Sequence, residues 1–353
     1  MRSFTAWIVS LFVLTETTSA INILLNNDDG FASANLRELY RYMKQQGHNV
    51  WIVAPSNQQS GQGGRSSFTS SRNLTRPSDY DIIPKGAPSV GPDPEDPHIW
   101  YYDGTPAACG FVGLDYVLPR FGDFEVPDLI LTGPNFGNNL GPFLFTLSGT
   151  LGAAYTAVER SVPAIAFSGS NGGQSYKDLT DEENPASWTA KVAAKIAQQF
   201  INATEPGNRI LPLGYGVSVN IPPLTSSYHD PPIVLTRITG GARVDAAVYN
   251  EEKGTFEYGS GPNVDGANQC INGDCNLPGE SIVVGDDKVS VSVFTVDYDA
   301  PLGEKTTAVQ EKVKVLTERF ETSEARRRAA PYWRPEGGDT GFKGVPRRTW
   351  DRD

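Results

Sequence analysis

The chain has 353 residues, of which 39% are hydrophobic, 10% aromatic and 20% charged. This composition is that of a folded globular protein and excludes bulk disorder, and the length suits one core domain with insertions. The 41 acidic residues against 30 Lys and Arg give a formal charge of -11, so no binding to a nucleic acid duplex is expected.

The first 20 residues have the pattern of a secretory signal peptide. Arg2 gives a positive start, residues 6–14 are almost continuously apolar, and small residues at 18–20 suit a cleavage site. The apolar run is too short to span a bilayer, and no later segment has the roughly 20 apolar residues of a transmembrane helix. We therefore expect a chain secreted to the cell exterior or cell wall, without membrane attachment. The alternative is a buried first strand or helix.

The glycosylation sequons and cysteines of the remaining chain indicate the cellular compartment in which the protein folds. Two glycosylation sequons, at Asn73 and Asn202, fit a secreted glycoprotein. Cys270 and Cys275 enclose a short segment that can close into a disulfide loop in an oxidising compartment. Cys109 lies within an apolar helical pattern, which predicts a buried, unreactive thiol.

Short apolar runs alternate along the chain with amphipathic segments, which is typical of an α/β protein. Continuous apolar runs indicate strands covered on both faces, and we predict such strands at residues 21–25, 50–54, 129–131 and 164–167. Helices are predicted after the N-cap residues Ser33, Thr105 and Ser148, because apolar residues recur there at helical spacing. Two further amphipathic patterns predict helices at 188–201 and 306–320.

Two stretches interrupt this alternation. Residues 71–97, rich in Pro, Asp and Ser, predict a surface insertion, and residues 240–280, rich in Gly and Asn, predict a hairpin arm. The chain becomes polar and basic after Phe320, which predicts a frayed tail. The predicted organisation is a signal peptide at 1–20, one domain at 21–322 and a tail at 323–353.

Polar residues gather where three predicted strands end. Asp28 and Asp29 follow the first strand, Ser60 lies in the loop after the second, and Asn135 follows the third. If these strands are parallel, the loops emerge at one edge of the sheet, where open α/β folds bind ligands. Two carboxylates, a hydroxyl and a carboxamide form an oxygen set that suits Mg²⁺, Mn²⁺ or Ca²⁺. Taken alone, Asp28 and Asp29 are equally consistent with an ordinary turn and helix cap.

A second polar group, Ser148, Gly149 and Thr150, stands at the start of a predicted helix. Small residues there expose backbone N–H groups and the positive end of the helix dipole, which together favour a phosphate group. A plain N-cap is compatible with the same residues. No P-loop and no nucleophile elbow is present, so attack by metal-activated water is the simplest chemistry.

Seven short motifs stand in a fixed order along the chain: Ile23–Gly30, Val53–Pro55, Ser60-Gly61, Asp103–Cys109, Thr132–Gly137, Ser148–Thr150 and Val162–Ala166. This ordered set resembles the SurE family over roughly residues 21–300. That family comprises acid phosphatases that act as 5′/3′-nucleotidases. The resemblance implies a Rossmann-like three-layer α/β/α core with a β-hairpin and C-terminal extension, and a homodimer or higher homo-oligomer formed through the C-terminal half.

The resemblance also implies one divalent metal cofactor, Mg²⁺ or Mn²⁺, and a small phosphomonoester substrate. Motif matching gives the metal-ligand roles to Asp28, Asp29, Ser60 and Asn135, with catalytic roles for Asp28, Asp29 and Asn135. It gives the phosphate-binding roles to Ser148, Gly149 and Thr150.

The chain departs from the family pattern at two places near these residues. Ala108 stands where the family usually has Asp, and Pro134 precedes Asn135 where an aliphatic residue is usual. Neither change removes a ligand. The expected function is a secreted, metal-dependent phosphomonoesterase acting on nucleoside monophosphates or similar esters. A noncatalytic secreted binding protein and a metal-dependent nucleotide-sugar transferase on a similar fold are the alternatives.

Overall fold

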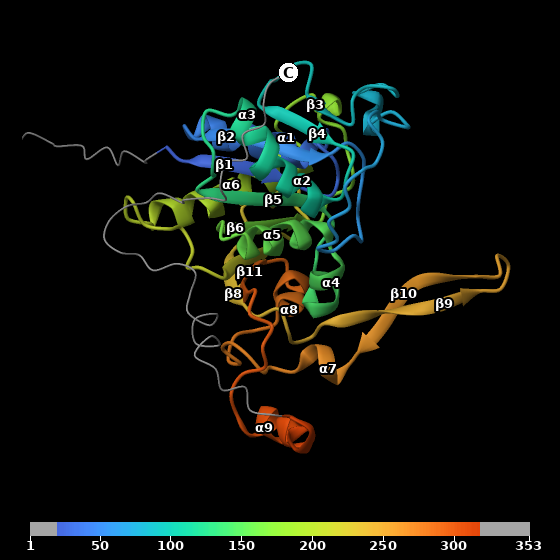
Figure 1. Ribbon diagram of the computed structural model, residues 1–353, viewed down its shortest axis with the longest axis vertical. Helices are drawn as coiled ribbons and strands as arrows, with labels where there is room; N and C mark the ends of the chain where they lie inside the picture. Colours follow the sequence, from blue (N-terminus) through green and yellow to red (C-terminus); the bar gives the residue numbers. More distant parts are fainter. Residues whose placement is uncertain (1–19, 318–353) are drawn as a thin grey trace, which may run out of the picture. The chain divides into compact units, whose positions relative to one another are not determined.

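The computed structural model describes residues 20–317 (Figure 1). These residues form two compact units, the first ending at Asp299 and the second beginning at Ala300. The predicted signal peptide, apart from Ala20, and the tail at 323–353 lie outside the described residues. The domain boundaries drawn from the sequence stay predictions. Over residues 20–317, no helix is both long and apolar enough to cross a membrane.

Within the described residues, a nine-stranded mixed sheet lies at the centre of the first unit. In spatial order its strands are β3 (Val90–Pro92), β4 (Ile99–Tyr102), β2 (Asn49–Pro55), β1 (Asn22–Asn26), β5 (Leu129–Phe136), β6 (Ala164–Gly169), β7 (Tyr215–Asn220), β11 (Val289–Thr295) and β8 (Ile233–Thr236). The pairs from β4 to β7 are parallel, whereas β3 and β11 run antiparallel to β4 and β7. The carboxyl ends of β1, β2 and β5 therefore meet at one edge.

Helices cover both faces of this sheet. Side chains of α1 (Ala34–Gln45) and α6 (Pro185–Asn202) form one buried cluster with Ile23 and Leu25 of β1. Leu24, which points to the opposite face, belongs to a second cluster that includes Leu151 of α5 (Gly149–Glu159). Both faces of β1 are thus buried, and the predicted three-layer α/β fold is confirmed.

The remaining helical segments are short. Those of the first unit are η1 (Asp79–Asp81), α2 (Pro106–Val112), the π-helical η2 (Gly113–Val117), α3 (Leu118–Phe121), α4 (Gly141–Leu147), η3 (Tyr176–Asp178), α7 (Asp265–Asn268) and α8 (Glu280–Gly285). The second unit contains α9 (Glu304–Glu311) and η4 (Lys314–Leu316). The helix predicted at 306–320 is therefore wrong in extent, since α9 ends at Glu311 and buries none of its residues; residues 318–320 lie outside the described part.

The segment predicted as a surface insertion, residues 71–97, packs against the core. Its Leu74 and Ile83 side chains belong to the same buried cluster as α1. An ion pair between Arg37 of α1 and Asp93 is almost fully shielded from solvent, which fixes the segment further. The insertion is therefore packed onto the core at the edge of the sheet.

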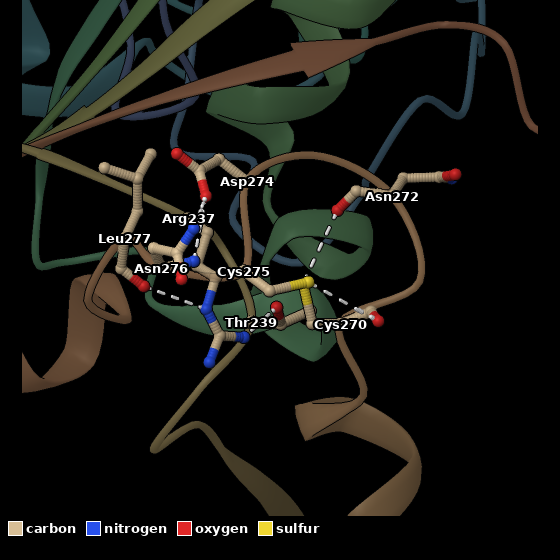
Figure 2. Close-up of a disulfide and its surroundings, with 8 residues drawn as sticks. All are labelled: Arg237, Thr239, Cys270, Asn272, Asp274, Cys275, Asn276 and Leu277. Carbon is tan, nitrogen blue, oxygen red and sulfur yellow. Dashed lines mark hydrogen bonds between the residues drawn. A yellow bond between two sulfur atoms is a disulfide. The ribbon is translucent and has the colours of Figure 1, made fainter.

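The predicted hairpin arm consists of β9 (Arg243–Asn250) and β10 (Thr255–Asn263), which pair antiparallel. Figure 1 shows this hairpin extending away from the sheet. The chain then returns through a loop closed by the Cys270–Cys275 disulfide (Figure 2). Arg237 holds the end of this loop by donating to the Leu277 carbonyl oxygen at 3.0 Å.

Candidate active site

The two adjacent aspartates lie at the carboxyl end of β1 and are almost completely buried. Asp28 is 2% exposed and Asp29 is 3% exposed. The chain turns directly after them at Gly30, whose φ of +91° is in the left-handed region that glycine tolerates best. Asn27 fixes this turn by donating to the Gly30 carbonyl at 3.1 Å and to the Ser33 hydroxyl at 2.8 Å.

Asp28 is in contact with the start of α5. The Thr150 hydroxyl donates a hydrogen bond to its Oδ1. Gly149 permits the approach, because a Cβ at this position would lie 2.8 Å from the Asp28 Cβ. Burial raises the pKa of Asp28, and hydrogen bonds from the Thr150 side chain and nearby backbone amides only partly oppose this effect. The predicted phosphate-binding turn therefore also supports a predicted metal ligand.

Asp29 accepts a hydrogen bond from the Phe136 backbone N–H at 2.7 Å, which ties it to β5. Its other oxygen lies 3.5 Å from Nε2 of Gln58. Burial, followed by the charge of Asp28, raises the pKa of Asp29 well above its usual range. Two buried neighbouring carboxyls cannot both ionise without a compensating positive charge.

Asn135 lies in β5 directly before Phe136, whose N–H bonds Asp29. The pairing of β5 with β6 is irregular between Thr132 and Asn135, which indicates a bulge. β5 continues beyond this bulge to Phe136 and is therefore longer than the strand predicted at 129–131. The Asn135 Nδ2 donates to the Gly137 carbonyl at 2.8 Å. Its buried Oδ1 has no hydrogen-bond partner among the described residues, so this oxygen is available to a ligand.

Ser60 is exposed in the loop after β2 and is connected to Asp29 indirectly. Gln58 lies between them, because its Nε2 also donates to the Ser60 hydroxyl. The loop is fixed against the end of α4, just before α5 begins, where the Gly63 N–H donates to the Leu147 carbonyl at 2.8 Å. The structure thus ties Asp29 to Phe136, the residue that follows Asn135, and links Ser60 to Asp29 only through Gln58.

These residues fit a hard divalent cation. The unpartnered Asn135 oxygen and the buried carboxyl pair form an oxygen-only donor set, which suits Mg²⁺ or Mn²⁺. No group of three or more His, Cys, Asp and Glu side chains arranged for a metal occurs in residues 20–317. A site at Asp28 and Asp29 therefore has to use neutral oxygens as well.

A cavity of about 450 Å³ opens beside Asp29. Besides Asp29, the cavity is lined by five residues to which the sequence motifs assign no role, namely Gln58, Asp79, Tyr80, Phe136 and Gly173. Asp79 is fixed there by accepting from Asn57 Nδ2 at 3.0 Å and from the Gln58 backbone N–H. No sequence pattern indicates a role for Asp79 and Tyr80, because their polar, proline-rich surroundings resemble a solvent-exposed loop.

The other candidate residues lie as follows. Ser148 is the N-cap of α5, and its hydroxyl accepts from the Leu151 N–H at 3.2 Å. Asn73 and Asn202 are both exposed. Cys109 is fully buried, as predicted, and burial raises the pKa of its thiol well above the usual range.

Comparisons with known proteins agree on one family. The profile described as "Survival protein SurE" matches residues 23–243. A protein of Yarrowia lipolytica named "Acid phosphatase" is 43% identical over 292 residues, which are 80% of this chain and 81% of that protein. A "5′-nucleotidase SurE" of Methanocaldococcus jannaschii is 32% identical over 62% of this chain and 72% of its own length. The crystal structure of the SurE protein from Aquifex aeolicus aligns with a TM-score of 0.56 and 24% identity, covering 83% of this chain and 98% of that one.

Proposed function

The chain belongs to the SurE family, and we propose that it is a secreted phosphomonoesterase that hydrolyses nucleoside monophosphates or similar small esters with one divalent cation. The relatives named acid phosphatase and 5′-nucleotidase are phosphoric monoester hydrolases, and this enzyme class holds for the chain. The observation that carries the proposal is the buried Asp28–Asp29 pair beside a cavity, together with the unpartnered oxygen of Asn135, whose neighbour Phe136 bonds Asp29.

Asp28, Asp29 and Asn135 would hold the cation, with Ser60 as the outer ligand. When bound, Mg²⁺ or Mn²⁺ supplies Lewis acidity toward the phosphoryl group and toward the attacking water. Thr150 orients Asp28 through its hydroxyl hydrogen bond, and the Phe136 N–H orients Asp29. The Ser148 hydroxyl, which accepts from the Leu151 N–H, can still donate its own proton to a phosphate oxygen, and the positive end of the α5 dipole favours an anion there.

Secretion, glycosylation and self-association are further parts of this proposal. The amino-terminal pattern supports export, and the exposed Asn73 and Asn202 support glycosylation. The hairpin supports an oligomer, because Phe256 and Tyr258 of β10 are 71% and 80% exposed. Apolar rings on an extended arm favour contact with a second copy of the chain.

The experiment is phosphate release by the purified protein from AMP, p-nitrophenyl phosphate and glycerol 2-phosphate, with Mg²⁺, with Mn²⁺ and with EDTA. We expect turnover with either metal, loss in EDTA, and recovery when excess metal is restored. A protein that releases no phosphate from any ester would favour the binding-protein alternative. Turnover that persists in EDTA would contradict the metal mechanism.

A further inference from the structure

Two aromatic side chains, Tyr80 and Phe136, line the cavity beside Asp29. Gly173 lies between them. A Cβ built on Gly173 would be 3.4 Å from Cδ2 of Phe136 and 3.9 Å from the Tyr80 hydroxyl oxygen. The absence of a side chain at Gly173 therefore leaves space that both aromatic residues border.

Tyr80 is held in place by the insertion. Its φ of +59° and that of Asp81, +54°, are in the left-handed region, which non-glycine residues rarely adopt. The neighbouring contacts maintain this conformation: Asp79 accepts from Asn57 and Gln58, and the Ser78 hydroxyl accepts from the buried Ile83 N–H at 2.9 Å. Rare backbone conformations that the surrounding structure maintains in this way cluster at functional sites.

We propose that Tyr80 is a specificity-determining residue, which together with Phe136 contacts a planar aromatic leaving group while the phosphate lies at Asp28, Asp29 and Asn135. This inference rests on the proposed phosphomonoesterase function. Aromatic faces stack on nucleobases and on aryl rings without requiring a particular hydrogen-bond pattern. The Tyr80 side chain is 42% exposed, so its ring is accessible to such a group. A polyol such as glycerol offers no ring to contact.

The size and polarity of the cavity agree with this ligand class. A volume of about 450 Å³ is within the range of small-molecule sites, about 300–1,000 Å³. Gln58 and Asp79 add polar groups beside the aromatic ones, which suits the hydrogen-bonding edge of a nucleobase. The favoured substrates are therefore nucleoside monophosphates and aryl phosphates.

The test compares kcat/KM for AMP with kcat/KM for glycerol 2-phosphate in the wild type, Tyr80→Ala, Tyr80→Phe and Gly173→Val. Stacking predicts that the ratio of the two values falls about tenfold in Tyr80→Ala, which corresponds to about 1.4 kcal/mol, and is largely kept in Tyr80→Phe. Gly173→Val should lower the same ratio by filling the space between the rings. Gly172→Val is the matched control, since a Cβ there meets no atom within 4 Å.

A binding measurement separates this inference from the proposed function. Adenosine, which has no phosphate, is titrated calorimetrically into the wild type and Tyr80→Ala in EDTA. Weaker adenosine binding by Tyr80→Ala supports the aromatic contact even if the wild type hydrolyses none of the esters, in which case only the proposed function fails. Unchanged adenosine binding, or Tyr80→Ala lowering kcat/KM equally for both esters, overturns the inference.

Discussion

At the scale of single residues, the most informative contact is the hydrogen bond from Thr150 to Asp28. The sequence pattern places Thr150 with Ser148 and Gly149 in a phosphate-binding turn, whereas its hydroxyl bonds a predicted metal ligand. Ser148 makes a different contact, with the Leu151 N–H of its own helix. The two hydroxyls therefore have separable roles, which their shared motif does not reveal.

Replacing Thr150 by Val should weaken Mn²⁺ binding as well as turnover. A hydrogen bond to a charged group contributes about 1.5–3 kcal/mol, or roughly tenfold or more in affinity. Thr150→Ser should retain most of the Mn²⁺ affinity, because Ser also has a hydroxyl group. Ser148→Ala is the comparison, with normal Mn²⁺ affinity and a stability loss of about 1 kcal/mol from the missing cap. Mn²⁺ titrations and denaturation curves measure both effects; equal Mn²⁺ affinities in wild type and Thr150→Val would show that the contact does not support the metal site.

At the scale of elements, the loop that carries Ser60 lies against α5 through two glycines. A Cβ on Gly152 would come within 1.9 Å of the Gly63 carbonyl oxygen. Since real side chains never approach so closely, α5 and the loop have to separate if Gly152 is replaced. The position of Ser60 therefore depends on Gly152, the fourth residue of α5.

Gly152→Ala should destabilise the protein and reduce turnover, although Gly to Ala within a helix ordinarily stabilises by about 1 kcal/mol. Gly110→Ala in α2 is the matched control, because its Cβ would make only an ordinary contact of 3.6 Å with the Asn26 amide. Thermal unfolding and phosphate release are measured for both variants. A Gly152→Ala protein as stable and active as Gly110→Ala would contradict the close packing of loop and helix.

The elements also show what a sequence can predict. The order of β1, α1 and β2 and the carboxylates after β1 follow from local apolar runs and N-cap residues, because both faces of these strands are buried. The extension of β5 depends on a bulge against β6, which is a tertiary feature. Asp79 and Tyr80 reach the cavity only because Leu74 and Ile83 anchor their segment in the core, and no local pattern indicates this.

At the scale of the whole molecule, Glu280 links stability to pH. This carboxyl of α8 is 1% exposed. It accepts from the Gly141 N–H at 2.6 Å and from the Ser292 hydroxyl at 3.0 Å. Burial raises its pKa to about 8 from 4.5. The folded state therefore binds this proton more tightly than the unfolded state does.

Stability should consequently fall as the pH rises from 4.5 to 8, because only the unfolded chain loses the Glu280 proton in that interval. Below pH 4.5, Glu280 is protonated in both the folded and the unfolded chain and does not lower the unfolding free energy. Above pH 8 it is ionised in both states, so the unfolding free energy falls no further on its account. Between pH 5 and 7.5, the wild type should lose up to about 3 kcal/mol of unfolding free energy relative to Glu280→Gln. Urea denaturation of both proteins at the two pH values measures this difference, and parallel pH profiles would contradict it.

The whole account depends on a cation held by the buried aspartates. The direct measurement is Mn²⁺ affinity and phosphate release from AMP for the wild type, Asp29→Asn and the control Asp230→Asn, whose carboxylate lies on the surface beside Lys195. We expect Asp29→Asn to lose about 100-fold or more in both quantities, with no loss of thermal stability. The control should behave like the wild type. An Asp29→Asn protein that binds Mn²⁺ and releases phosphate as well as the wild type would contradict the account.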